Sequence, residues 1–275
     1  MDHTFLSKNV AIKKISETES VGVFEITNLY TGYGVTLGNA LRRVLLSSLP
    51  GAAVTQIKIK GVKHEFSTIS GVLEDVVDIM LNMKKIRFSF FADEPQTLSL
   101  KKKGEGVVTA ADIQSSSQVI IKNPSTHIAT LTAKDSEIEI ELTIEKGLGY
   151  VPAEFRKSEK LPIGAIALDA IFTPVVNVNF EATNMRVGDR TDYNKLTLTI
   201  ETDKTISPSR ALHKAANILR DHLQIVSDIE VSEEFIPIEK TEKTKTIAAK
   251  DVSEKKSVKT KKTTRLDSET KRNKK

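Results

Sequence analysis

The chain has 275 residues, of which 39% are hydrophobic and 28% are charged, a composition typical of a globular protein with one or two domains. The lack of cysteine excludes disulfides and cysteine-ligated zinc, and no apolar run approaches the roughly 20 residues that a membrane span needs. The net charge of +5 is uneven, because residues 240–275 carry 14 Lys and Arg against 5 Asp and Glu. The preceding body is therefore mildly acidic, and the overall basicity is no reason to expect it to bind nucleic acid.

The N-terminal part predicts a β-hairpin that leads into a helix. Val10–Glu17 and Val21–Asn28 have the composition of strands, with the polar stretch SETES between them. The following segment, YTGYGVTLGNALRRVLLSSLP from Tyr30 to Pro50, has the three-and-four spacing of a helix. We expect Thr36 to be its N-cap and Pro50 to end it. The predicted stripe on one face consists of Leu37, Ala40, Leu41, Val44, Leu45 and Ser48.

The opposite face of this helix is polar. It carries Asn39, Arg42, Arg43 and Ser47. Two adjacent arginines with no nearby acid usually form a solvated face, and the alternative is a docking face for a partner protein. The pattern alone leaves both interpretations open. The glycines of GYGVTLG do not have the spacing of a phosphate-binding loop, so we expect them to serve a tight turn.

A strand and a second helix are predicted next. Residues 54–60 alternate as a half-buried strand does, and Ser70–Met83 has a helical period. The expected apolar face of this helix consists of Leu73, Val76, Val77, Met80 and Leu81. The acids expected on its solvent side, where they suit the helix dipole, are Glu74, Asp75 and Asp78. Lys84 and Lys85 follow the helix.

The middle of the chain predicts a β-rich module, and the part after it a third long helix. Short strand-like runs fill Ile86–Ile166, and further strands are expected at Val175–Phe180 and Lys195–Thr202. Ser207 and Pro208 have the order of an N-cap and a first helical residue. The helix stripe consists of Leu212, Ala216, Leu219, Leu223 and Val226. So wide an apolar surface needs cover from its own sheet, from a second copy of the chain, or from both.

No residue pattern in the sequence indicates an active site. The five histidines, His3, His64, His127, His213 and His222, are scattered and form no H-E-x-x-H pattern. Acids near the second helix could bind a cation, but their position is more typical of a solvated helix start. From about Glu239 onward the sequence has no periodicity and few large apolar residues, so we expect disorder there.

Several long motifs, in order from about Leu29 to Leu223, resemble the alpha subunit of bacterial-type RNA polymerase. They are GYGVTLGNALRRVLLSSLPGAAV, VKHEFSTISGVLEDVVDIMLNMKKI, VTAADI, GYVPA, IFTPV and RVGDRTDYNKLTL. The resemblance implies an α+β protein with a discontinuous architecture. Residues 1–50 and 171–235 would form a dimerisation domain, residues 51–170 an inserted β-rich domain, and residues 236–275 a disordered Lys-rich tail.

The resemblance also implies which residues meet partners. Dimerisation would use the first and third helices, through Leu37, Leu41, Val44, Leu45, Leu212, Ala216, Leu219, Leu223 and Val226. Beta and beta-prime would be bound through Asn39, Arg42, Arg43, Ser47, Lys84 and Arg190. Lys85 and Asp189 depart from the residues usual in the family at these places, which puts the local turn geometry in question.

The function implied is that of an assembly scaffold in a cytoplasmic DNA-directed RNA polymerase. The homodimer would collect beta and beta-prime, with omega and sigma joining the assembled enzyme. This chain would bind no cofactor, and Mg²⁺ is expected in the catalytic subunits. Nothing in the sequence resembles the family's helical C-terminal domain, so DNA contact would be indirect or weak through the tail. The alternatives are a free nucleic-acid-binding protein acting through its basic tail and an enzyme in its own right.

Overall fold

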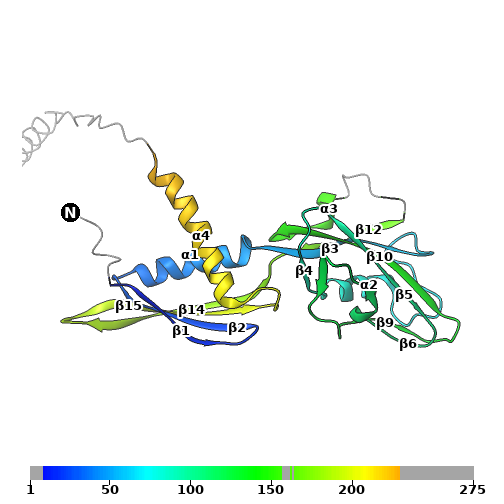
Figure 1. The fold of residues 1–275 in the computed structure, drawn as a ribbon, viewed down its shortest axis with the longest axis horizontal. Helices are drawn as coiled ribbons and strands as arrows, with labels where there is room; N and C mark the ends of the chain where they lie inside the picture. Colours follow the sequence, from blue (N-terminus) through cyan, green and yellow to red (C-terminus); the bar gives the residue numbers. More distant parts are fainter. Residues whose placement is uncertain (1–8, 157–161, 163, 230–275) are drawn as a thin grey trace, which may run out of the picture. The chain divides into compact units, whose positions relative to one another are not determined.

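A computed structural model describes residues 9–156, 162 and 164–229 (Figure 1). The fold is a mixed α+β arrangement in which strands predominate, as the sequence predicts. Two main clusters of buried side chains lie within residues 9–228, each with its own sheet. The expected disordered tail, residues 236–275, lies outside the described residues. The predicted domain boundaries remain a prediction.

The first sheet is antiparallel and joins the two ends of the described chain. Its strand order is β1-β2-β15-β14. The strands are β1 (Ala11–Glu17), β2 (Val21–Leu29), β14 (Val175–Val187) and β15 (Arg190–Thr202). The hairpin predicted at the N-terminus is confirmed, whereas β14 and β15 are longer than predicted because they meet in a tight turn at Gly188, whose φ is +62°. RVGDRTDYNKLTL is therefore a hairpin rather than a loop that precedes a strand.

Two helices bury their apolar sides on this sheet. They are α1 (Tyr33–Ser47) and α4 (Pro208–Ser227). α1 contacts β14, β15 and α4, so the helices and the sheet enclose one core. Ser207 is the N-cap residue of α4 and Pro208 its first residue, as predicted. The N-cap prediction for α1 is wrong: the helix begins at Tyr33 after Gly32, and the Thr36 hydroxyl donates to the Gly32 carbonyl at 3.2 Å inside the first turn.

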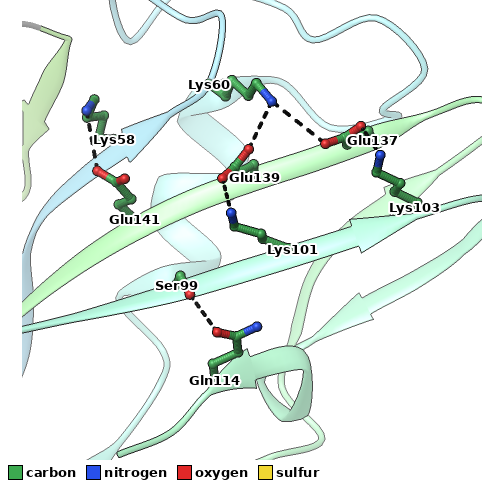
Figure 2. Close-up of polar contacts among 9 residues, drawn as sticks. All are labelled: Lys58, Lys60, Ser99, Lys101, Lys103, Gln114, Glu137, Glu139 and Glu141. Carbon is green, nitrogen blue, oxygen red and sulfur yellow. Dashed lines mark hydrogen bonds and ion pairs between the residues drawn. The ribbon is translucent and has the colours of Figure 1, made fainter.

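The second core belongs to a five-stranded sheet with the order β12-β3-β10-β5-β7. The strands are β3 (Pro50–Ile59), β5 (Gln96–Lys103), β7 (Ile113–Gln114), β10 (Glu137–Leu148) and β12 (Ala165–Ala167). The shorter pairs are β4 (Phe88–Phe90) with β8 (Val119–Ile121), β6 (Gly106–Thr109) with β9 (His127–Leu131), and β11 (Tyr150–Val151) with β13 (Ala170–Ile171). Short helical turns are η2 (Ala110–Asp112) and α3 (Ala153–Arg156). One side of the large sheet is apolar and buried, and the other carries alternating lysines and glutamates (Figure 2).

The helix of the second core, α2, spans only Val76–Met83. The prediction that it begins at Ser70 is wrong, because Asp75 is the N-cap and accepts a hydrogen bond from the Asp78 N–H at 2.7 Å. The predicted apolar face is right for Val76, which is buried, and for Met80, which packs partly against the core, but wrong for Leu73 and Leu81. The fully buried residues of α2 are Val76, Ile79 and Met83. Leu73 and Leu81, at 72% and 51% exposure, lie on the surface.

Candidate functional site

The polar face of α1 is a surface with two free cations. Asn39, Arg42, Arg43 and Ser47 are all exposed. Within the described part of the chain, no carboxylate lies within 4.0 Å of either arginine, while the Ser47 hydroxyl donates to the Arg43 carbonyl at 2.7 Å. The opposite side of the helix is anchored by Leu41 and Leu45, which are 6% and 0% exposed. The arginine face is therefore presented by a rigidly packed helix.

The start of α1 is held by a side chain from a distant strand. Asn194 of β15 accepts hydrogen bonds at its Oδ1 from the N–H groups of Gly32 at 2.8 Å and Gly34 at 3.3 Å. Its Nδ2 donates to Asn184 Oδ1 at 3.1 Å, and Asn194 is only 8% exposed. An N-cap satisfies N–H groups that have no partner inside the helix. Sequence reasoning missed Asn194 because it stands some 160 residues from the helix that it caps.

Arg190 lies in a cluster beside the same helix start. Its guanidinium donates to both carboxylate oxygens of Asp192, at 3.0 and 2.6 Å, and stands 5.3 Å from the ring centroids of Tyr30 and Tyr193. The Thr31 hydroxyl donates to the same carboxylate at 2.7 Å. The Arg190 guanidinium holds the pKa of Asp192 well below its ordinary value. The predicted partner-binding charge of Arg190 is thus already paired within the chain, and its cluster fixes the loop before α1.

Lys84 also has an internal partner. Its ammonium group forms an ion pair with Asp169 at 3.0 Å, and the other oxygen of Asp169 accepts from the Ala153 N–H at 2.9 Å. The Ala153 hydrogen bond, followed by that of Lys84, lowers the pKa of Asp169. These residues line a cavity of about 340 Å³. Its other walls are Lys63, Glu65, Val77, Met80, Leu81, Ala165, Ile166, Ala167 and Leu168.

This cavity, which we call the α2 groove, unites motifs that are far apart in the sequence. The loop after β3, the outer side of α2, the GYVPA segment and β12 all contribute to it. Three residues expected on the apolar face of α2, namely Val77, Met80 and Leu81, line it. Met80 also packs partly against the second core. Lys85, by contrast, is exposed and donates to Asn82 Oδ1 at 2.9 Å. The groove is therefore a surface with apolar walls and one fixed ion pair.

α4 is buried in its first half and exposed in its second. Ala211, Leu212 and Ala215 are buried in the first core. Every residue from Arg220 to Ile229 is exposed, and this stretch includes Leu223 and Val226 at 65% and 61% exposure. The second half of α4 therefore leaves an apolar surface open.

The residues predicted to mediate dimerisation fall into three groups. Leu41, Leu45 and Leu212 are buried in the core of their own chain. Leu37, Val44 and Leu219 are half-buried against that core. Ala216, Leu223 and Val226 are exposed. The structure brings α1 and α4 into contact with each other, while the role of these nine residues in dimerisation stays a prediction.

The acids near α2 are engaged in structural contacts. Glu74 accepts from the Thr130 N–H at 2.6 Å and pairs with His127 at 2.7 Å, and these contacts lower its pKa against the opposing effect of burial. Among residues 9–156, 162 and 164–229, no three His, Cys, Asp or Glu side chains gather as a metal site would require. No helix in that part is long and apolar enough to cross a membrane.

The chain is similar to known proteins over most of its length. Residues 57–173 match the family model described as the RNA polymerase Rpb3/RpoA insert domain. The chain is 52% identical over 217 residues to a DNA-directed RNA polymerase subunit alpha of Roseiflexus castenholzii, covering 79% of this chain and 67% of the relative. It is 48% identical over 229 residues to the subunit of the same name from Alkaliphilus oremlandii, covering 81% and 72%. For Symbiobacterium thermophilum the identity is 51% over 211 residues, covering 77% and 67%.

Proposed function

Because the chain belongs to the family of DNA-directed RNA polymerase alpha subunits, we propose that it dimerises and then collects the beta and beta-prime subunits. It would act in the cytoplasm, within an RNA polymerase that also contains the omega and sigma subunits. The chain itself supplies no catalytic group and no cofactor site, and the Mg²⁺ of the nucleotidyl-transfer reaction is held by the catalytic subunits.

The observation that carries the dimer proposal is the open second half of α4. Leu223, Ile225 and Val226 are 61–71% exposed on a helix whose first half is well packed. Exposed apolar surface of this kind is typical of protein interfaces, and a short helix without tertiary contacts is only marginally stable in water. A second copy related by a twofold axis would cover both helix ends at once.

The α1 arginine face and the α2 groove supply the surfaces for the large subunits. Arg42 and Arg43 lack an ion-pair partner in the described part of the chain, and arginine is favoured at the centres of interfaces. Lys84 and Arg190 serve a different purpose in this proposal, since their charges are internally paired. They hold the α2 groove and the start of α1 in the conformation to which beta and beta-prime bind. One sequence carries both surfaces, so each copy in the dimer uses the one facing its large subunit.

The dimer is tested by measuring the mass of the full chain in solution by light scattering. The wild type should be a dimer. Leu223→Asp combined with Val226→Asp should give a folded monomer, because two charges would have to be buried in an apolar interface. Leu73→Asp, at an exposed leucine that lies before α2 and outside α4, is the control and should stay dimeric. A double variant that remains a dimer at micromolar concentration contradicts the proposal.

A further inference from the structure

A second cavity, separate from the α1 arginine face and the α2 groove, is lined by positive charges. It has a volume of about 430 Å³ and lies where the start of β3, the strand β4 and the first half of α4 approach one another. Its charged lining residues are Lys122, Lys146, Arg210 and Lys214, and no Asp or Glu lines it. We call it the β4 pocket. Four like charges around one cavity favour an anionic occupant.

The charges of the β4 pocket are largely unpaired. Within the described residues only Lys146 has a carboxylate within 4.0 Å, that of Asp93 at 3.8 Å, whose side chain is 98% exposed. Asp203 lies two residues before the pocket residue Thr205, but its carboxylate already has partners. It accepts from the Thr205 N–H at 3.0 Å and lies 3.8 Å from Arg87. The pocket therefore retains most of its positive charge.

One wall of the pocket is the edge of a strand. β4 belongs to a two-stranded sheet with β8. The Lys122 N–H donates to the Arg87 carbonyl and the Phe91 N–H to the Gln118 carbonyl, both at 2.9 Å. Hydrogen bonding alternates along an antiparallel pair, so the backbone groups of Phe88 and Phe90 point away from β8. Phe88 is itself only 2% exposed and Phe90 is half-buried, so an extended peptide can pair with this edge at Phe90 rather than along its whole length.

The pocket also offers apolar surface. Phe91 is 68% exposed, and Phe90 and Ile206 are half-buried where they line the cavity. A cavity with apolar walls and cationic rims suits a segment in which acidic and apolar side chains alternate, because alternate residues of a strand face opposite sides. A single-stranded nucleic acid would instead need several aromatic side chains spaced along a groove for successive bases.

We propose that the β4 pocket docks an extended acidic segment of a partner protein, which aligns along β4 with its carboxylates toward Arg210 and Lys214 and an apolar side chain beside Phe91. The site is additional to the surfaces proposed for dimerisation and for the large subunits. The recognition combines a strand edge, which fixes the backbone, with charge complementarity, which selects an acidic sequence.

The test uses the absence of cysteine from the chain. Ser89→Cys in the full-length dimer places a unique thiol in the pocket wall for an environment-sensitive fluorophore. The probe is a capped hexapeptide of alternating glutamate and valine, which spans roughly 20 Å when extended. Its glutamine counterpart and a short oligothymidylate are the comparison ligands. A label inside the pocket reports local binding, whereas the basic residues 240–275, present in every variant, would attract any anion.

The glutamate peptide should change the fluorescence with saturation, and the glutamine peptide should not. Arg210→Gln with Lys214→Gln should weaken the response at least tenfold. Lys13→Gln with Lys134→Gln removes the same charge from exposed lysines outside the pocket, and should leave the response unchanged. The proposal is overturned by a glutamate peptide that gives no response, or by equal weakening in both double variants. Tighter binding of the oligothymidylate, lost with Arg210 and Lys214, would instead make the pocket a nucleic-acid site.

Discussion

At the scale of single residues, both long helices of the first core are capped from strands that are distant in sequence. Asn194 of β15 caps α1. Glu17 of β1 caps α4, accepting at one oxygen from the Ser209 N–H at 2.9 Å and the Ser209 hydroxyl at 2.6 Å. Each cap satisfies helix N–H groups and at the same time fixes where the helix begins on the sheet. These two side chains therefore determine the placement of the surfaces that α1 and α4 present.

Replacing Asn194 by alanine should destabilise the chain by about 2 kcal/mol, the upper end of the range for a lost N-cap, because Asn194 is buried and its removal also leaves Asn184 without a donor. Urea unfolding measures this loss as a lower midpoint. Asn194→Asp keeps the acceptor at the helix start and should cost less. Thr36→Ala, at the residue that the sequence suggested as the cap, should change the midpoint little. A larger effect of Thr36→Ala than of Asn194→Ala would contradict the assignment.

Glu17 makes the stability depend on pH. Hydrogen bonds from Lys14 and from Ser209 lower its pKa from 4.5 to about 2. A carboxylate with a lowered pKa stabilises the folded state fully above its unfolded pKa, and this contribution disappears as the pH falls through the folded pKa. The wild type should thus be more stable than Glu17→Gln at pH 7, and the difference should shrink between pH 5 and about pH 2. A difference that is constant over this range would show that the Glu17 charge is not what caps α4.

At the scale of elements, the outer face of the large sheet is a lattice of ion pairs (Figure 2). Glu137, Glu139 and Glu141 of β10 lie between the lysines of β3 and β5. Lys60 contacts both Glu139 at 3.0 Å and Glu137 at 3.9 Å. Since cross-strand neighbours of opposite charge favour one register, the lattice specifies how β3, β10 and β5 align.

Glu139→Gln should lower the urea midpoint slightly at low salt, because Glu139 is paired with both Lys101 and Lys60. The effect should largely vanish in 1 M salt, where the Debye length is about 3 Å. Glu105→Gln, at an exposed glutamate with no ion pair in the described part of the chain, serves as the control. A loss for Glu139→Gln that persists undiminished in high salt would indicate a packing role rather than an electrostatic one.

The approach of α1 to β14 depends on a glycine. A Cβ added at Gly38 would lie 2.5 Å from the Cδ2 atom and 2.9 Å from the Cγ atom of the Phe180 ring. Gly→Ala in a helix ordinarily stabilises by about 1 kcal/mol, but overpacking costs roughly 1–3 kcal/mol. We expect the clash to exceed the gain, so that Gly38→Ala is destabilising in thermal or urea unfolding. Adding Phe180→Leu to Gly38→Ala should recover part of the lost stability. If the stability changes of the two substitutions simply add, the contact with Phe180 is not the cause of the loss.

The sequence predicted the elements whose signals are local and missed those set by tertiary contacts. Periodicity and the Ser-Pro pair were sufficient to place α4, and turn composition was sufficient for the β1–β2 hairpin. The extent of α2 was overestimated because the residues before Asp75 continue a helical period. Those residues instead bond to β9, where the Leu73 N–H donates to the Thr130 carbonyl at 3.0 Å. Among the predicted site residues, the exposed α1 face was recognisable, whereas the internal pairing of Lys84 and Arg190 was not.

At the scale of the whole molecule, the chain passes between its two cores twice, and the passages touch. α1 leads almost directly into β3, whose second residue is Gly51, and the return passes through Phe172 into β14. A Cβ on Gly51 would lie 1.8 Å from the Phe172 carbonyl oxygen, so only glycine permits this contact. Ala53, Ala170 and Phe172 form a small buried cluster there. The arginine face at the end of α1 is consequently connected to the second core through a closely packed junction.

The proposal that the α1 arginine face binds the beta subunit is tested at this scale by Arg43→Ala. Arg43 is exposed on the side of α1 away from Leu41 and Leu45, so its truncation should open no cavity and should leave the mass of the dimer unchanged. Loss of an arginine from the centre of an interface costs about 2 kcal/mol, so capture of purified beta subunit should weaken by about thirtyfold. Lys13→Ala, at an exposed cation on β1, should bind beta as the wild type does. Undiminished capture by Arg43→Ala, or dissociation of its dimer, would show that this face does not receive the beta subunit.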